Sequence, residues 1–261
     1  MTAAHHLRRI QSYLRVAAPS GRDHARIGPF LATFNRETDN PYLNYAIPDD
    51  DADPTADDVA ALVAAYREAE RKPRLEYIPA VAPAVEAVLL EGGFEVEART
   101  PLMVYDPTAA TAPPVPAGIE LVAASADAEL RAAAAVQWEA YEERGPVAEH
   151  AVKGLRRTLE AGGIVALARD EASGEPAGAG LCSAPHDAST ELAAVGVRPS
   201  FRRRGIAAAM TGWLAARAAE RGIENVFLMA DSEAEARIYA RAGFRAVSEV
   251  LHIGRGEDGR S

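Results

Sequence analysis

The segment from Glu191 to Ala208 constrains the fold of this chain more than any other. Its short Val-rich run, Leu192–Val197, predicts a buried strand, and Pro199 ends that strand because proline cannot donate to the ladder. Three arginines and Gly205 follow, and a helical pattern begins directly after them at Ile206. A strand, a basic glycine loop and a helix start together present backbone N–H groups and a positive helix end to an anion.

The composition of this loop excludes two common anion-binding motifs. It lacks the Gly-Lys-Ser/Thr of a nucleoside-triphosphate loop and the Gly-x-Gly-x-x-Gly of a dinucleotide fold. It does contain Arg202, Gly205 and Ala207 in the spacing Arg/Gln-x-x-Gly-x-Gly/Ala. That pattern resembles the acyl-CoA pyrophosphate loop of the GNAT N-acetyltransferase superfamily. An exposed basic helix start gives the same six residues, so the flanking sequence decides between the two interpretations.

Composition narrows the class of protein. With 261 residues, of which 48% are hydrophobic, the chain can bury a core in one or two domains. A net charge of −10 disfavours nucleic acid and anionic membranes as partners. The single cysteine, Cys182, excludes an intramolecular disulfide and a Cys-based zinc site, and its strand-like surroundings predict a core residue. Without a membrane-length apolar run or a signal core behind Arg8 and Arg9, we expect a soluble, cytoplasmic protein without a metal.

Four prolines between Asp106 and Gly118 indicate a linker. We therefore expect three parts: residues 1–105, a linker at 106–117, and residues 118–261. Beyond the linker the predicted order is strand, two helices, three strands, helix, strand, helix and strand. Over residues 118–254 this order resembles the complete GNAT fold, an α/β (α+β) mixed sheet with helices on both faces.

A shift of 150 residues brings the two halves of the chain into register. Three short segments of the same element type coincide: residues 91–94 with 241–244, 75–78 with 225–228, and 46–47 with 196–197. The match indicates a duplication, and therefore two GNAT-like domains in tandem with the first one truncated.

The same alignment predicts that the first copy is degenerate. Opposite Arg202, Gly205 and Ala207 stand Ala52, Thr55 and Asp57, and opposite Tyr239 stands Leu89. The equivalent loop, Asp49–Asp58, holds six aspartates and would repel a pyrophosphate. We expect the first half to cover or shape the active site or to build an oligomer interface, with a homodimer left open.

The resemblance implies acetyl-CoA as co-substrate and assigns its binding residues by position. The pyrophosphate loop comprises Arg202, Arg203, Arg204, Gly205, Ile206, Ala207 and Ala208. The splayed strand before it, through Val195, Gly196 and Val197, pairs with the pantetheine arm, and the Val195 N–H lies near the acetyl oxygen.

A tyrosine on the helix after the next strand is the general acid of the family, and the segment Arg237–Phe244 places Tyr239 at that position. A phenol is a competent acid toward a thiolate. The alternative is an amphipathic core tyrosine. Where the family often has an asparagine, seven residues earlier, this chain has Ser232.

Glu191, eleven residues before Arg202, falls where some GNAT enzymes carry a catalytic glutamate; the alternative is a strand-edge charge. Glu139, Glu142 and Glu143 either attract a cationic amine or form a solvated face. The remaining titratable candidates, His150, His186 and His252, are isolated in the sequence and receive no role.

These features together predict an acetyl-CoA-dependent N-acetyltransferase whose second half is catalytic. The acceptor is a primary amine of a small molecule or a peptide. Direct attack in a ternary complex is favoured, because Cys182 is the sole thiol. Two alternatives stay open: a non-catalytic acyl-CoA-binding or regulatory module, and an acyltransferase that uses another acyl-CoA.

Overall fold

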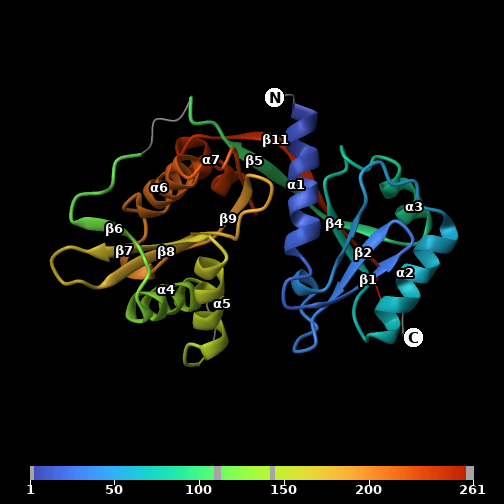
Figure 1. Ribbon diagram of the computed structural model, residues 1–261, viewed down its shortest axis with the longest axis horizontal. Helices are drawn as coiled ribbons and strands as arrows, with labels where there is room; N and C mark the ends of the chain where they lie inside the picture. Colours follow the sequence, from blue (N-terminus) through green and yellow to red (C-terminus); the bar gives the residue numbers. More distant parts are fainter. Residues whose placement is uncertain (1–2, 109–112, 142–144, 257–261) are drawn as a thin grey trace. The chain divides into compact units, whose positions relative to one another are not determined.

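A computed structural model describes residues 3–108, 113–141 and 145–256 (Figure 1). The chain divides into two compact units, Met1–Leu102 with Val247–Ser261, and Met103–Ala246. The boundaries of these units are not those of the expected parts. The second unit already includes the predicted linker at 106–117, and the residues from Val247 on belong with the first half of the chain. Strand pairing explains the second difference, because the last strand of the chain joins the sheet of the first unit.

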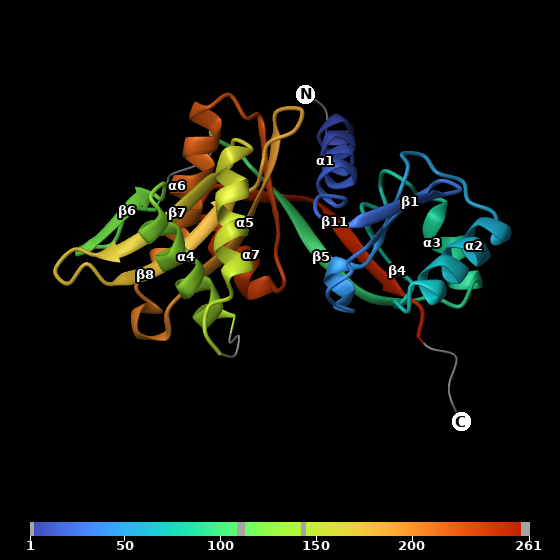
Figure 2. The same cartoon turned by 60° about the horizontal axis from the view of Figure 1, so that its bottom comes forward.

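The first unit places helices on both faces of a mixed sheet. Its elements are α1 (Ala3–Ala17), β1 (Asp23–Ile27), β2 (Phe30–Phe34), η1 (Pro41–Leu43), β3 (Ala46–Pro48), α2 (Ala56–Glu68), β4 (Arg74–Tyr77), α3 (Val85–Glu91) and β5 (Glu95–Tyr105). It also contains the last strand of the chain, β11 (Phe244–Gly254), from Val247 on. The strand order is β1-β2-β3-β4-β11-β5. Figure 2 shows α2 and α3 on one side of these strands and α1 on the other.

The second unit has the same layering. Its elements are β6 (Ile119–Ala123), α4 (Asp127–Ala140), α5 (Glu149–Glu160), β7 (Ile164–Asp170), β8 (Pro176–Cys182), β9 (Ser189–Val197), η2 (Pro199–Phe201), α6 (Ile206–Glu220), β10 (Asn225–Met229) and α7 (Glu233–Arg241), together with the end of β5 from Met103 on. The strand order is β5-β10-β9-β8-β7-β6. Helices α4 and α5 cover one face, and α6 and α7 cover the other (Figure 1). Met210 and Leu214 fill the core under α6, and Leu130 and Val136 fill the core under α4.

Three local patterns of the sequence predict elements that the structure forms differently. The apolar run from Ile27 to Phe34 predicts one strand, but it contains a hairpin turn followed by β2, because Gly28 takes a φ of +51° and Pro29 has no N–H for a ladder. The run from Tyr42 to Ile47 also predicts a strand, but it begins as the 3₁₀ turn η1 and reaches strand geometry only at Ala46. Ser125 is the predicted cap of α4, but the side chain of Glu129 takes this role: it accepts hydrogen bonds from the backbone N–H of Ser125 at 2.8 Å and of Ala126 at 3.0 Å.

The structure agrees with the predicted duplication. Helices α2 and α6 begin at Ala56 and Ile206, 150 residues apart, and strands β4 and β10 begin at Arg74 and Asn225, 151 residues apart. Strands β5 and β11 begin 149 residues apart. The neighbours of β5 and β11 are exchanged, however. β11, the last strand of the second half, pairs with β4 of the first half, whereas β5, the last strand of the first half, lies next to β10 of the second half.

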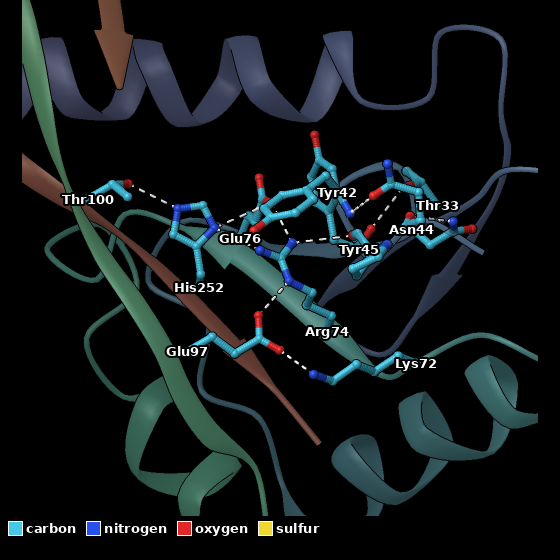
Figure 3. A network of polar contacts seen from close by, with 12 residues as sticks. Thr33, Tyr42, Asn44, Tyr45, Lys72, Arg74, Glu76, Glu97, Thr100 and His252 are labelled. Carbon is cyan, nitrogen blue, oxygen red and sulfur yellow. Dashed lines mark hydrogen bonds and ion pairs between the residues drawn. The ribbon is translucent and has the colours of Figure 1, made fainter. Parts of the chain in front are cut away.

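A buried polar network attaches β11 to the first unit (Figure 3). The Arg74 side chain, 2% exposed, donates to Glu97 at 2.7 Å, contacts Nδ1 of His252 at 2.9 Å and pairs with Glu76. The other ring nitrogen of His252 lies 3.0 Å from the Thr100 hydroxyl. Burial opposes the charge of Glu76, but His252 and Arg74 hold the pKa of this carboxyl below its usual value. The network thus joins β4, β5 and β11 through polar side chains.

Candidate active site

The N-terminus of α6 is open toward an incoming anion. Gly205 occupies the N-cap position with a φ of +85°, and no side chain caps the helix there. A Cβ at this position would meet the Pro116 ring at 3.9 Å, within the ordinary contact range. Arg203 also has a positive φ, +63°, which turns the loop sharply before the helix. Backbone N–H groups of the first helical turn and the adjacent arginines therefore suit a phosphate.

The arginines of this loop are exposed and differ in their local contacts. Arg202 Nε donates to the Val197 carbonyl at 3.2 Å, which folds its side chain back onto the end of β9. The guanidinium of Arg204 lies 5.4 Å from the ring centre of Phe201. Phe201 is itself buried in the core below the loop, so its ring is held in place beneath the Arg204 cation.

In the equivalent loop of the first unit, the start of α2 is already capped by side chains. Thr55 and Asp58 form a reciprocal capping box that occupies the start of α2. The preceding aspartates bind arginines of the first unit: Asp49 binds Arg26 at 2.8 Å, Asp50 binds Arg15 at 2.7 Å, and Asp51 binds Arg8 at 2.8 Å. The predicted acidity of this loop is thus accompanied by ion pairs, which sequence reasoning missed because their partners lie 23 to 43 residues away.

Strand β9 diverges from β10 toward the loop. The register pairs β10 with Ser189–Glu191 alone, so the pairing stops before the predicted pantetheine segment. On its other edge, β9 changes register against β8 between Ala179 and Leu181. Ala194 and Val195 lie there opposite the single residue Gly180, and Ala194 has a φ of +54°. This geometry fits the expectation that Val195, Gly196 and Val197 lie in a splayed part of the strand.

Helix α4 packs closely on this bulge. A Cβ at Gly196 would lie 2.7 Å from the Ala140 Cβ, so glycine is required for this approach. Gln137 Nε2 donates to the Ala194 carbonyl at 3.0 Å. Sequence reasoning missed Gln137, because one glutamine in an alanine-rich helix carries no signal of the strand it faces.

Tyr239 lies on α7 and is half-buried. Its ring packs against the core below α6 and meets Phe244 edge-on, with 6.5 Å between ring centres. Burial raises the pKa of the Tyr239 phenol, and the nearby Glu235, Tyr141 and Asp231 raise it further. The hydroxyl therefore stays protonated at neutral pH, as a proton donor must, although the same packing suits a core tyrosine.

Glu191 lies in β9, where its carbonyl accepts a hydrogen bond from the Ser183 N–H at 2.8 Å. Its neighbour Leu192 is buried in the core under α6, so alternation directs Glu191 to the opposite face of the sheet. Glu139, the other candidate that the structure describes, binds Arg198 at 3.0 Å. Glu142 and Glu143 lie outside the described residues.

The remaining candidates of the sequence analysis have local partners. Ser232 caps α7, where its hydroxyl accepts from the Glu235 N–H at 3.2 Å. Cys182 is buried, and burial raises the pKa of its thiol to about 12. His150 packs against Trp138, and His186 forms an isolated bridge with Ser189.

The described residues contain neither a metal-binding cluster nor a membrane-spanning helix. No group of three or more His, Cys, Asp or Glu residues there is arranged to hold a metal ion. None of the helices in that part of the chain combines the length and the apolar character needed to cross a membrane.

Comparison with known proteins agrees with this geometry. Residues 129–244 match the family described as "Acetyltransferase (GNAT) family". The second unit therefore contains a GNAT acetyltransferase domain. A search of curated proteins found no match.

Solved structures show the same fold along nearly the whole chain. A GCN5-related N-acetyltransferase from Kribbella flavida is 24% identical, with a TM-score of 0.78 and 96% of each chain covered. A tandem GNAT protein from the clavulanic acid biosynthesis pathway is 16% identical, with a TM-score of 0.67 over 98% of this chain and 88% of that one. A GCN5-related N-acetyltransferase from Sphaerobacter thermophilus is 19% identical, with a TM-score of 0.66 over 87% and 76%. The chain is thus built from two GNAT-like regions in tandem.

Proposed function

We propose that this protein is an acetyl-CoA-dependent N-acetyltransferase that acetylates a primary amine of a small molecule or peptide in its second half. One observation carries the proposal: the uncapped, open N-terminus of α6 directly follows a bulged strand that has separated from β10. The match of residues 129–244 to the acetyltransferase family supports the same activity. The ion-paired loop and capped α2 of the first unit argue for one CoA site in each chain.

In this proposal two segments of the chain bind CoA. The amides and arginines of residues 202–208 bind the pyrophosphate, and the edge of β9 at residues 195–197 pairs with the pantetheine arm. The Val195 N–H donates to the acetyl oxygen and stabilises the negative charge that develops there. A bound acyl-CoA thioester supplies an activated acyl group and a thiolate leaving group.

Two side chains handle the protons. Glu191 takes a proton from the acceptor ammonium, directly or through water, and thereby frees the lone pair that forms the new C–N bond. Tyr239 donates its proton to the sulfur as the C–S bond breaks, and the second proton that the nitrogen loses on becoming an amide restores the phenol. The raised pKa of the phenol keeps it in the form that donates.

Direct transfer to the amine is favoured over a covalent enzyme intermediate. Cys182 is the sole cysteine of the chain, and its thiol is buried with a pKa raised to about 12. A thiolate nucleophile needs a lowered pKa and access to substrate.

Binding and turnover test the proposal together. Calorimetry of the full chain with CoA should give one site per chain. Acetyl-CoA with a panel of primary amines should release free thiol, and mass spectrometry should find the acetylated amine. CoA binding without turnover on any amine would favour a non-catalytic CoA-binding module, and turnover with succinyl- or malonyl-CoA alone would favour another donor.

A further inference from the structure

The bulge in β9 holds an alanine in an unfavourable conformation. Ala194 has a φ of +54°, a region that residues with a Cβ rarely adopt and that costs about 1–2 kcal/mol. The register change between β8 and β9 places this residue opposite no partner in the paired ladder. The surrounding structure must therefore maintain the conformation of Ala194.

Gln137 supplies a contact that can do so. Its Nε2 donates to the Ala194 carbonyl at 3.0 Å in a half-buried position. The backbone of α4 is close to the same point, because a Cβ on Gly196 would meet Ala140 at 2.7 Å and the Gln137 Cα at 3.9 Å. The glutamine thus reaches the bulge from a helix that is already packed against it.

The orientation of one peptide follows from this bond. The Ala194 carbonyl and the Val195 N–H belong to the same planar trans peptide and point in opposite directions. A hydrogen bond that fixes the carbonyl therefore fixes the direction of the N–H. We infer that Gln137 is a positioning residue of the transfer reaction: by holding the Ala194 carbonyl, it aims the Val195 N–H at the thioester oxygen. This inference rests on the proposed function, which gives that N–H its task.

Two substitutions separate positioning from packing. Gln137→Leu keeps the approximate volume but removes the donor, and Gln137→Glu replaces the donor by a carboxylate that can donate only when protonated. Arg131→Met is the matched control, since Arg131 lies on the exposed face of the same helix and binds Glu149. Thermal melting of each variant shows whether it is folded, and Gln137→Asn serves if Gln137→Leu does not fold.

For Gln137→Leu we expect kcat to fall about 10-fold, which is less than the loss of an oxyanion donor itself. The calorimetric affinity for CoA should stay within about twofold, because residues 202–208 are unchanged. Hydrogen exchange of the amides at 194–196 should accelerate in the free protein, whereas the amides of β7 should not change. For Gln137→Glu, the rate relative to wild type should be lowest at neutral pH and rise toward pH 5, as the carboxyl gains its proton.

The outcomes distinguish this inference from the proposed function. If wild type binds CoA and acetylates an amine while Gln137→Leu keeps the wild-type kcat, Gln137 has no positioning role. The inference would also be overturned if Gln137→Leu lost kcat and CoA affinity equally. It would be overturned as well if the rate of Gln137→Glu relative to wild type did not vary with pH. Either result indicates that Gln137 contributes packing alone. If wild type neither binds CoA nor releases thiol, the proposed function fails first and the inference fails with it.

Discussion

Nη2 of Arg74 lies 2.9 Å from Nδ1 of His252, across 178 residues of sequence. The same Nδ1 lies 3.4 Å from Oε1 of Glu76, and the other ring nitrogen lies 3.0 Å from the Thr100 hydroxyl. The His252 ring therefore contacts a guanidinium, a carboxylate and a hydroxyl. All three belong to the first unit, which thus holds the end of β11 through this one side chain.

Removing Arg74 should destabilise the first unit strongly. Arg74→Met leaves Glu76 and Glu97 in or near the core without their main cation, and breaking a buried ion pair in this way costs about 3–5 kcal/mol. The matched control is Lys72→Met, because Lys72 binds the same Glu97 but its side chain is 44% exposed. That change should cost less than about 1 kcal/mol. Urea unfolding followed by circular dichroism measures both; equal costs would contradict a buried network.

Glu129 should make the stability of the second unit depend on pH. Hydrogen bonds from the Ser125 and Ala126 N–H groups and from Arg169 lower the pKa of this carboxyl to about 2. Because its pKa is lower in the folded than in the unfolded chain, the stabilisation is complete above about pH 5 and is lost as pH falls toward 2. Glu129→Gln should therefore be less stable than wild type by about 1 kcal/mol at pH 7.

At pH 2 the two proteins should unfold at similar urea concentrations. Glu160→Gln, at the exposed end of α5, serves as the control and should follow wild type throughout. A deficit of Glu129→Gln that is equal at pH 7 and pH 2 would contradict the role of the ionised carboxylate.

Gly205→Glu should abolish CoA binding. The new side chain adds a negative charge at the proposed pyrophosphate site and requires a residue with a Cβ to adopt a φ of +85°. Gly222→Glu carries the same charge and nearly the same strain, since Gly222 has a φ of +79° with open space around it at the far end of α6. Calorimetry should find binding lost in the first variant and retained in the second. If Gly205→Glu still binds CoA, the proposal that this loop binds the pyrophosphate is wrong.

The order of elements in the second half, including the strand, loop and helix start around Gly205, was predictable because it depends on local sequence. Pro199 and Gly205 mark the end of a strand and the start of a helix whatever the rest of the chain does. The exchange of β5 and β11 was not predictable in this way. Both strands follow a helix and a Gly-Phe pair, Gly93-Phe94 and Gly243-Phe244, so neither sequence specifies which half of the chain it joins.

Candidate residues can be proposed from the sequence where a motif contains them but not where only geometry does. The spacing of the segment Arg237–Phe244 proposes Tyr239, whereas no sequence signal indicates the positive φ of Ala194, since alanine gives no sign of a left-handed conformation. His252 and Arg74 are likewise isolated in the sequence and meet only through the pairing of β4 with β11. Contacts of this kind depend on tertiary structure that periodicity does not encode.

Tyr239→Phe should lower kcat about 10²–10⁴-fold with little change in CoA affinity, because it deletes the proposed acid and keeps the ring. Tyr105→Phe is a matched control, since Tyr105 also packs against Phe244, with 5.5 Å between ring centres. Its kcat should stay within about threefold of wild type. Because the pKa of Tyr239 is raised, the wild-type rate should show no loss from phenol ionisation up to about pH 10. If Tyr239→Phe lowers kcat by less than about threefold, Tyr239 is a core residue and not the general acid.

Glu191→Gln should change the shape of the pH–rate profile. An acceptor ammonium has a pKa near 10, so almost all of the amine is protonated and unreactive at pH 7. If Glu191 removes that proton, the glutamine variant should be slowed most at neutral pH and approach wild type as pH nears the pKa of the amine. A strand-edge charge would instead give a deficit that does not vary with pH, or none. Profiles of kcat/KM with one good amine distinguish the two, and parallel curves would exclude Glu191 as the base.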